Sequence, residues 1–154
     1  MAKLLSRNDQ DIVLIDEDEE RLAGISSDYD LMTVHASPSS IQALKNAGTG
    51  NADLYIGVTP DENMNMNSCI LAKGLGAKRT VAKVNNYEFL NPELKDFFAK
   101  IGIDSLIYPE NLAAQDIVNG LKMSWVRQRW DVHNGALVML GIKLRETCEI
   151  LNEP

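Results

Sequence analysis

Two polar side chains stand directly after short apolar runs of the chain. Asp16 follows the run 12–15, and Thr59 follows the run 54–58. Runs of this length are typical of strands buried on both faces of a parallel sheet, and parallel strands end at the same edge of that sheet. An acid at such an edge can accept hydrogen bonds from ribose hydroxyls, or it can be a solvated acid that begins a turn.

Ser37 and Thr59 are also suited to begin helices. Thr59 stands before Pro60, with Glu62 three residues after it, which is the pattern of a capping box with proline at the first helical position. Ser37-Pro38 has the same order of cap and proline. The sequence therefore predicts helices that begin at Pro38 and Pro60, and capping alone would explain both hydroxyl side chains.

The remaining reactive side chains do not indicate metal or disulfide chemistry. His35 and His133 lack Cys, Asp or Glu partners at metal-ligand spacing, so structural histidines are favoured over ligands. The acidic run 16–20 is typical of a solvated helix start. Cys69 and Cys148 form no C-x-x-C pair, so neither a disulfide framework nor a zinc site is predicted.

The overall composition is that of one globular domain that does not bind nucleic acid. The chain has 154 residues, of which 45% are hydrophobic and 24% are charged. A net charge of −7 argues against a polyanionic partner, because phosphate binding needs clustered Lys and Arg. No apolar run approaches the roughly 18 residues that span a bilayer, and the start is not a signal peptide. A soluble, cytoplasmic protein without direct membrane insertion is expected.

Short apolar strands alternate with helical stretches along the chain. The strands are predicted at 12–15, 31–34, 54–58, 80–84 and 105–107. Pro109 is expected to open the last helix, which reaches about Arg129, and a β-prone run follows at 136–142. This alternation predicts an α/β fold with a parallel sheet and helices on both faces.

The order of these segments resembles the TrkA N-terminal domain family, also called RCK or KTN domains. The segments that carry the resemblance are 15–22, 34–38, 52–63, 81–84 and 106–110. The resemblance runs from the start to about Gly120, and residues from about Asn134 look like the opening strand of the family's second subdomain, cut short here. It implies a Rossmann-like nucleotide-binding domain at 1–130, and a connector with a truncated C-terminal subdomain at 131–154.

The resemblance implies a nucleotide across the carboxyl ends of the strands. Asp16, with Glu17 beside it, would accept hydrogen bonds from the ribose. Because an acid repels a 2′-phosphate, NAD(H) or an adenine nucleotide such as ATP or ADP is expected rather than NADP(H). Ala36 and Ser37 would lie against the adenine. Thr59 would line the middle of the cleft, and Lys83 would meet the phosphates or a neighbouring subunit.

One family feature does not occur in this sequence. Family members begin with a strand, then G-x-G-x-x-G and a helix, whereas 1–6 looks like the back half of that helix. Gly48-Thr49-Gly50 and Gly74-Leu75-Gly76 are not substitutes, because both follow helices. A wrongly assigned start or a truncation is our preferred interpretation, and binding by this chain is in doubt for that reason.

The missing strand would leave two inner sheet edges without partners. The two edges could close on each other, the run 136–142 could fill the gap, or another chain could lend a strand. The favoured hypothesis is that the missing strand is compensated in a dimer. The methionines at 64, 66 and 123 are expected in the core or an interface, and Trp125 and Trp130 are candidates for a subunit interface.

The resemblance implies a nucleotide-sensing regulatory subunit of a Trk/Ktr-type potassium uptake system rather than an enzyme. Its partners would be further copies of itself and an integral-membrane potassium transporter, which it would gate through a ligand-dependent conformational change. A fragment of an NAD-dependent oxidoreductase is an alternative, although no acid–base pair supports it. The third alternative is an oligomerisation module that binds no nucleotide.

Overall fold

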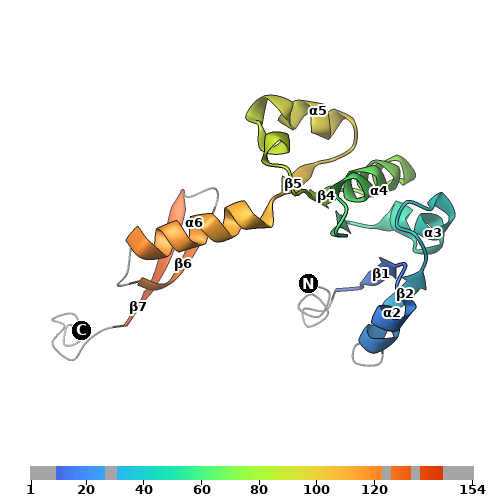
Figure 1. The fold of residues 1–154 in the computed structure, drawn as a ribbon, viewed down its shortest axis with the longest axis horizontal. Coiled ribbons are helices and arrows are strands. Elements are labelled where there is room, and N and C mark those ends of the chain that lie inside the picture. Colours follow the sequence, from blue (N-terminus) through green and yellow to red (C-terminus); the bar gives the residue numbers. More distant parts are fainter. Residues whose placement is uncertain (1–9, 27–30, 123–125, 133–135, 144–154) are drawn as a thin grey trace. The chain divides into compact units, whose positions relative to one another are not determined.

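The computed structural model describes residues 10–26, 31–122, 126–132 and 136–143. The chain divides into two compact units, Met1–Tyr108 and Pro109–Pro154 (Figure 1). The predicted helix at 1–6, together with Met123, Trp125, His133 and Cys148, lies outside the described residues. The domain boundary expected near residue 130 stays a prediction.

The first unit alternates strands with helices, as the sequence predicts. Each of the five predicted strands is present within one or two residues of its expected bounds. In chain order the elements are β1 (Val13–Asp16), α2 (Glu19–Ser26), β2 (Met32–His35), α3 (Ile41–Asn46), the 3₁₀ turn η2 (Thr49–Asn51), β3 (Tyr55–Gly57), α4 (Glu62–Leu75), β4 (Thr80–Lys83), the 3₁₀ turns η3 (Tyr87–Leu90) and η4 (Pro92–Leu94), α5 (Lys95–Lys100) and β5 (Ser105–Ile107).

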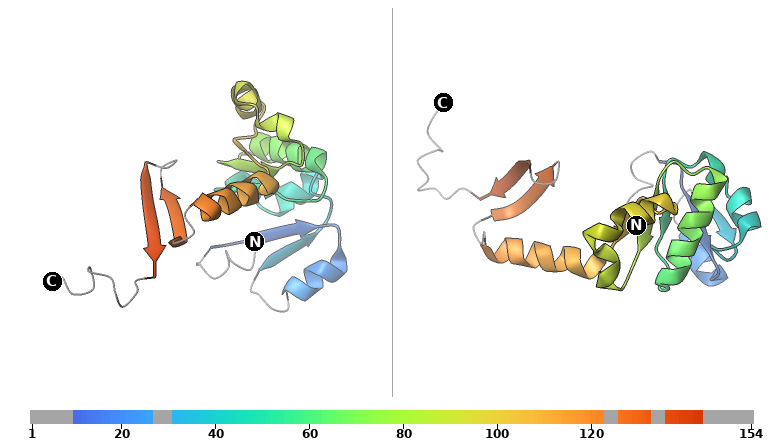
Figure 2. Two further views of the ribbon diagram at one scale, coloured as in Figure 1. Left: turned by 60° about the vertical axis from the view of Figure 1, so that its left-hand side comes forward. Right: turned by 90° about the horizontal axis from the view of Figure 1, so that it is seen from above.

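All strand pairs in this unit are parallel. β1 pairs with β2, and β3, β4 and β5 form a second sheet in that order. Figure 2 shows the β1–β2 pair with α2 packed beside it. The mixed α/β fold with parallel strands therefore agrees with the prediction. In the β1–β2 pair, Asp16 lies beside His35, so the two strands end at the same level.

The two parallel sheets do not join within the described residues. No hydrogen-bonded ladder there links β1 to β3. The first alternative, in which these two strand edges pair directly with each other, is therefore not observed there. The run 136–142 does not fill the gap either, because it pairs with β6. Residues of β1 are not buried as predicted, and Val13 is 39% exposed, because the main contacts of β1 among the described elements are with β2 and α2. A strand lent by another chain stays a prediction.

Helix α4 packs against β3 and β4 with one narrow face. Its buried residues recur at the helical spacing i, i+3, i+4 and i+7, and they are Asn65, Ser68, Cys69 and Ala72. All four are small or medium-sized, so the helix approaches the sheet closely. At the closest point a Cβ on Gly57 would lie 2.9 Å from the Asn65 carbonyl oxygen, which is why β3 has glycine there.

The main hydrophobic core joins α4, β4 and α5. Its buried members are Cys69, Ala82, Phe98 and Ile103, and Met66 packs against them, which confirms the expected core role for this methionine. The Cys69 Sγ donates a hydrogen bond to the Val81 carbonyl oxygen at 3.3 Å. Burial raises the pKa of its thiol to about 11, so the thiolate is disfavoured and this cysteine is structural.

The helix starts differ from those predicted. Helix α4 begins two residues later than predicted, at Glu62, because Asp61 is the N-cap and accepts hydrogen bonds from the backbone N–H of Asn63 and Met64. Helix α3 is capped by Ser40, which accepts from the Ala43 N–H at 3.3 Å. The prolines lie before the helices, since a carboxylate or hydroxyl closer to the first turn satisfies its free N–H groups.

Asp104 ties the start of β5 to β4 and α4. Its Oδ2 accepts hydrogen bonds from the Thr80 N–H at 2.8 Å and from the Lys73 ammonium at 2.7 Å. The Thr80 hydroxyl donates to the Gly102 carbonyl oxygen at 2.7 Å and accepts from the Asp104 N–H at 3.0 Å. Lys73 first, and the Thr80 N–H in addition, hold the pKa of Asp104 below its ordinary value.

This lowered pKa predicts a loss of stability in acid. The charged form of Asp104 is favoured in the folded state, so its contribution is present above the unfolded-state pKa of about 4 and is lost as pH falls through the lower folded value. We expect the free energy of unfolding, measured by urea denaturation, to fall less between pH 6 and pH 3 in Asp104→Asn than in the unsubstituted chain. Asp11→Asn, at an exposed acid, is the control, and an equal change in both variants would contradict the assignment.

The described part of the second unit contains one helix and a hairpin. Helix α6 (Pro109–Lys122) is followed by the antiparallel strands β6 (Val126–Val132) and β7 (Leu137–Ile142) (Figure 2). The expected β-prone run is therefore a strand. The expected helix to Arg129 is wrong, because the strand-favouring residues Val126, Trp130 and Val132 lie opposite the strand β7.

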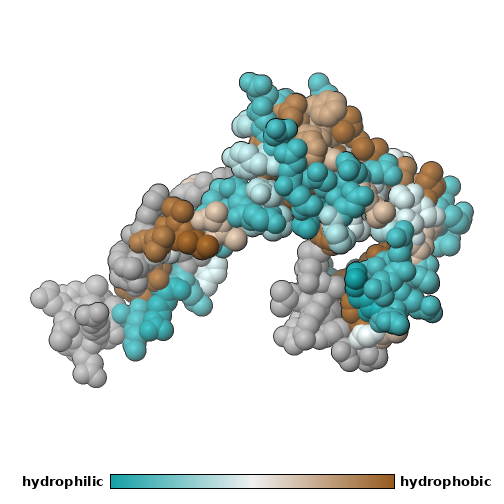
Figure 3. All heavy atoms as spheres, viewed as in Figure 1, coloured by the Kyte–Doolittle hydropathy of each residue, from teal (hydrophilic) through white to brown (hydrophobic). Residues whose placement is uncertain are grey.

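Apolar side chains of the second unit are exposed. Figure 3 shows a hydrophobic patch on α6. The exposed apolar residues of α6 are Leu112, Ile117, Val118 and Leu121, and Trp130 on β6 is 49% exposed. No helix among the described residues is long and apolar enough to span a bilayer.

Candidate functional site at the strand ends

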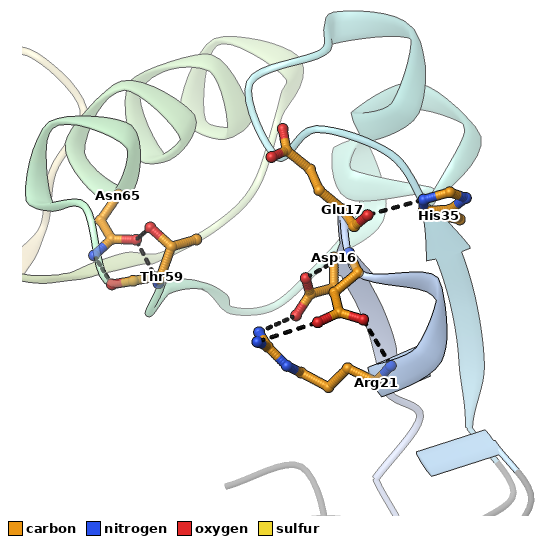
Figure 4. A network of polar contacts seen from close by, with 7 residues as sticks. Asp16, Glu17, Arg21, His35, Thr59 and Asn65 are labelled. Atoms are coloured by element: carbon orange, nitrogen blue, oxygen red, sulfur yellow. Dashed lines mark hydrogen bonds and ion pairs between the residues drawn. The ribbon is translucent and has the colours of Figure 1, made fainter. Parts of the chain in front are cut away.

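The first group of predicted site residues lies where β1 and β2 end. Asp16 is the last residue of β1, with about a quarter of its side chain exposed. The Ala36 N–H donates to the Asp16 carbonyl oxygen at 3.1 Å. The His35 Nε2–H donates to the Glu17 carbonyl oxygen at 2.9 Å, as Figure 4 shows. Asp16, Glu17 and Ala36 are thus brought together, and His35 acts structurally.

Arg21 is a member of this group that the sequence reasoning missed. Its guanidinium contacts the Asp16 Oδ2 at 3.1 Å and the Asp18 Oδ2 at 3.3 Å. The Asp16 Oδ1 also accepts from the Asp18 N–H at 3.0 Å. Because α2 begins at Glu19, Arg21 lies in its first turn, close to the end of β1. This position five residues after Asp16 is the sequence signal from which the ion pair could have been predicted.

The Asp16 carboxylate keeps acceptor capacity despite these contacts. Each of its oxygens can accept two hydrogen bonds, so lone pairs remain for ribose hydroxyls. Arg21 weakens the repulsion that Asp16 would exert on a 2′-phosphate. The run 16–20 holds five acids beside this one arginine, so the expected preference for NAD(H) over NADP(H) is retained as a prediction.

The second group lies where β3 and β4 end, and one buried side chain holds it. Asn65 on α4 is 1% exposed. Its Oδ1 accepts from the Thr59 N–H at 2.7 Å and from the Thr59 hydroxyl at 2.8 Å. Its Nδ2 donates to the carbonyl oxygens of Thr59 at 2.9 Å and Lys83 at 3.0 Å. Thr59, in the loop after β3, and the backbone of Lys83, at the end of β4, are therefore joined by an amide that was not predicted.

The loop after β4 is held to the start of α4 as well. The Glu62 Oε2 accepts from the N–H groups of Asn85 at 2.7 Å and Asn86 at 2.9 Å. The Asn85 Nδ2 donates to the Pro60 carbonyl oxygen at 3.1 Å. Glu62 was expected to complete a capping box, but it bonds a loop more than twenty residues further along. These contacts hold the carboxyl ends of β3 and β4 to the start of α4.

The structure does not link every predicted residue. The Ser37 hydroxyl pairs with that of Ser39 at 3.0 Å and does not cap a helix. Figure 4 draws no hydrogen bond between the Asp16 group and the Thr59 group. In the part of the chain that the structure describes, no cluster of His, Cys, Asp or Glu could hold a metal ion.

A cavity of about 440 Å³ lies away from these strand ends. Its lining includes Phe89, Pro92, Lys95 and Phe98, together with Ser105 at the start of β5. Because the start of a parallel strand is the opposite edge of the sheet from its carboxyl end, this cavity is not part of the predicted nucleotide site.

Comparison with known proteins places these features in a family. The model of the TrkA-N domain matches residues 1–109. The Trk system potassium uptake protein TrkA of Haemophilus influenzae is 37% identical over 119 residues, which are 76% of this chain and 26% of that protein. The chain thus spans about a quarter of that relative's length.

Solved structures share the fold at low identity. The TrkA-N domain of the Escherichia coli inner membrane protein YbaL superposes with a TM-score of 0.66 at 13% identity, covering 78% of this chain and 85% of that one. The GsuK channel bound to NAD has a TM-score of 0.54 at 19% identity, covering 69% of this chain and 18% of that one. A second GsuK structure, with a TM-score of 0.55, is bound to ADP. The family model covers most of the chain, and its parallel α/β fold agrees with these structures, so the chain belongs to the TrkA-N domain family.

Proposed function

We propose that this chain is the nucleotide-sensing part of a regulatory subunit of a potassium uptake system. The observation that carries the proposal is the position of Asp16, Ala36, Thr59 and Lys83 at, or one or two residues after, the carboxyl ends of strands in two parallel sheets. Ligands of open α/β sheets bind at that edge. The potassium uptake role rests on the name of the TrkA relative.

NAD(H) is the ligand that we propose first, with ATP or ADP as the alternative. The Asp16 carboxylate supports a ribose with free hydroxyls, and the GsuK structures with NAD and ADP belong to proteins of similar fold. Ala36 and Ser37 would lie against the adenine, Glu17 beside the ribose, and Lys83 near the phosphates. The nucleotide would act by binding two conformations of the assembly with different affinity, and the favoured conformation would gate the transporter.

The test of this proposal is the affinity for NADH with and without the Asp16 charge. Calorimetric titration of the 154-residue chain up to about 1 mM is expected to give saturable binding, since a Kd of that size is still worth about 4 kcal/mol. Asp16→Asn is expected to lower the affinity about tenfold or more, because hydrogen bonds to a charged acceptor are worth about 1.5–3 kcal/mol.

Asp18→Asn is the matched control for this experiment. Asp18 also contacts Arg21, and its Oδ1 accepts from the Arg21 N–H at 2.9 Å, a bond that asparagine can replace. Its affinity for NADH is expected within twofold of the unsubstituted chain. Equal losses in the two variants would assign the effect to general charge and would count against a ribose site at Asp16.

We propose further copies of this chain and an integral-membrane potassium transporter as partners, at the cytoplasmic face of the membrane. Support for self-association comes from the second unit. A two-stranded hairpin is at best marginally stable alone, and α6 and β7 both expose apolar residues. Sedimentation of the chain at micromolar concentration is expected to give a dimer or larger species, and a monomer under these conditions would contradict this part of the proposal.

A further inference from the structure

The Thr59 hydroxyl has a single proton and two neighbours that can only accept it. The Asn65 Oδ1 lies 2.8 Å from the Thr59 Oγ1, and the Asp61 carbonyl oxygen lies 3.0 Å from it. Neither neighbour carries a hydrogen to donate. Whichever of the two takes the proton, the hydroxyl has no hydrogen left for a third partner.

The orientation of the Asn65 amide is fixed by its surroundings. The Thr59 N–H points at one end of the amide, and the carbonyl oxygens of Thr59 and Lys83 lie against the other end. In the reversed orientation an NH₂ group would face an N–H, and an oxygen would face two carbonyl oxygens. Because Asn65 is 1% exposed, water cannot relieve such a mismatch. The amide oxygen of Asn65 must therefore face the N–H and the hydroxyl of Thr59.

We infer that Thr59 presents only lone pairs to a ligand, and therefore selects a ligand group that donates a hydrogen bond. This inference rests on the proposed nucleotide function. A ribose hydroxyl or a carboxamide N–H₂ can donate to Thr59. A phosphate oxygen of an ionised nucleotide cannot, because it is an acceptor facing an acceptor. Thr59 thus marks the place of a sugar or carboxamide, and the phosphates must find donors elsewhere.

The test uses Thr59→Val, which keeps the side-chain shape and the backbone contacts with Asn65 and removes only the hydroxyl. AMP, ADP, ATP and NADH are titrated into the unsubstituted chain and the variant. We expect about threefold to tenfold weaker binding for at least NADH. If the donor is a hydroxyl of the adenosine ribose, AMP, ADP and ATP lose the same factor, and a deoxyribose analogue without that hydroxyl loses nothing. If the donor is the carboxamide or a hydroxyl of the nicotinamide ribose, only NADH loses affinity.

Thr33→Val is the control, because Thr33 lies two residues before the end of β2 and is half-buried like Thr59. It is expected to change none of the four affinities. A loss at Thr59→Val that grows from AMP to ADP to ATP would place a phosphate at the hydroxyl and overturn the inference. An unchanged affinity for all four nucleotides would overturn it as well.

A measurement without ligand separates this inference from the proposed function. In the free chain, the Asn65 side-chain NH₂ protons are expected to exchange slowly with solvent by NMR, because the side chain is buried and both protons donate to backbone carbonyl oxygens. Rapid exchange would overturn the geometry on which the inference depends, whatever the chain binds. No saturable binding of any nucleotide by the unsubstituted chain would overturn the proposed function and the inference together, whereas a phosphate-dependent loss would overturn the inference alone.

Discussion

Replacement of Phe98 by alanine is expected to lower the free energy of unfolding of the chain by about 3–5 kcal/mol. Phe98 is the one buried residue of α5, and its ring contacts those of Phe89 and Phe97 with centroids 5.9 and 5.3 Å apart. It packs in the core with Cys69 and Ile103. Alanine would leave a cavity there and detach the segment between β4 and β5. Urea denaturation followed by circular dichroism measures the change.

The neighbouring aromatic residue is the control for this prediction. Phe97 is 54% exposed, although it contacts the Phe98 ring edge to face. Phe97→Ala is expected to lower the free energy of unfolding by no more than about 1.5 kcal/mol, which is the worth of an aromatic pair beyond area burial. Similar decreases in the free energy of unfolding in the two variants would mean that the burial of Phe98 is not what holds α5 in place.

Asn65→Ala is expected to lower the free energy of unfolding by about 3 kcal/mol. The substitution leaves the Thr59 N–H and the carbonyl oxygens of Thr59 and Lys83 without their partner. Each buried polar group that loses its hydrogen bond costs about 1–3 kcal/mol. Thr59 is half-exposed, so water can replace part of its lost hydrogen bonding and the total is expected to be less than the sum. The same denaturation experiment tests it.

Asn67 offers a matched control on the same helix. It is exposed, so Asn67→Ala is expected to change the free energy of unfolding by less than about 0.5 kcal/mol. Because the Asn65 amide also orients Thr59, Asn65→Ala is expected to weaken NADH binding at a temperature where the variant is still folded. Unchanged stability in Asn65→Ala would show that water replaces the amide, and the strand ends would then not be held by it.

The sequence alone determined the parallel α/β fold and the order of its five strands. Apolar runs such as 12–15 and 54–58 are local signals, and the alternation with helical segments leaves few topologies. The polar residues after these runs were assigned to one edge for the same reason. Asp16, Thr59 and Lys83 lie at strand ends because parallel strands run in one direction.

Only the tertiary structure decided which side chains hold that edge. The contacts that hold it are made by Asn65, Glu62 and Arg21 with residues up to two dozen positions away in sequence. The type of a residue does not predict which distant residue it will contact. The helix starts and the strand β6 were predicted wrongly for a related reason. A capping residue and a β-prone segment each have two local choices. Asp61 is the cap because its carboxylate reaches the N–H groups of Asn63 and Met64, and the pairing with β7 replaces the end of the longer helix. Local patterns set which elements form, whereas packing between distant segments sets where they begin and what their side chains contact.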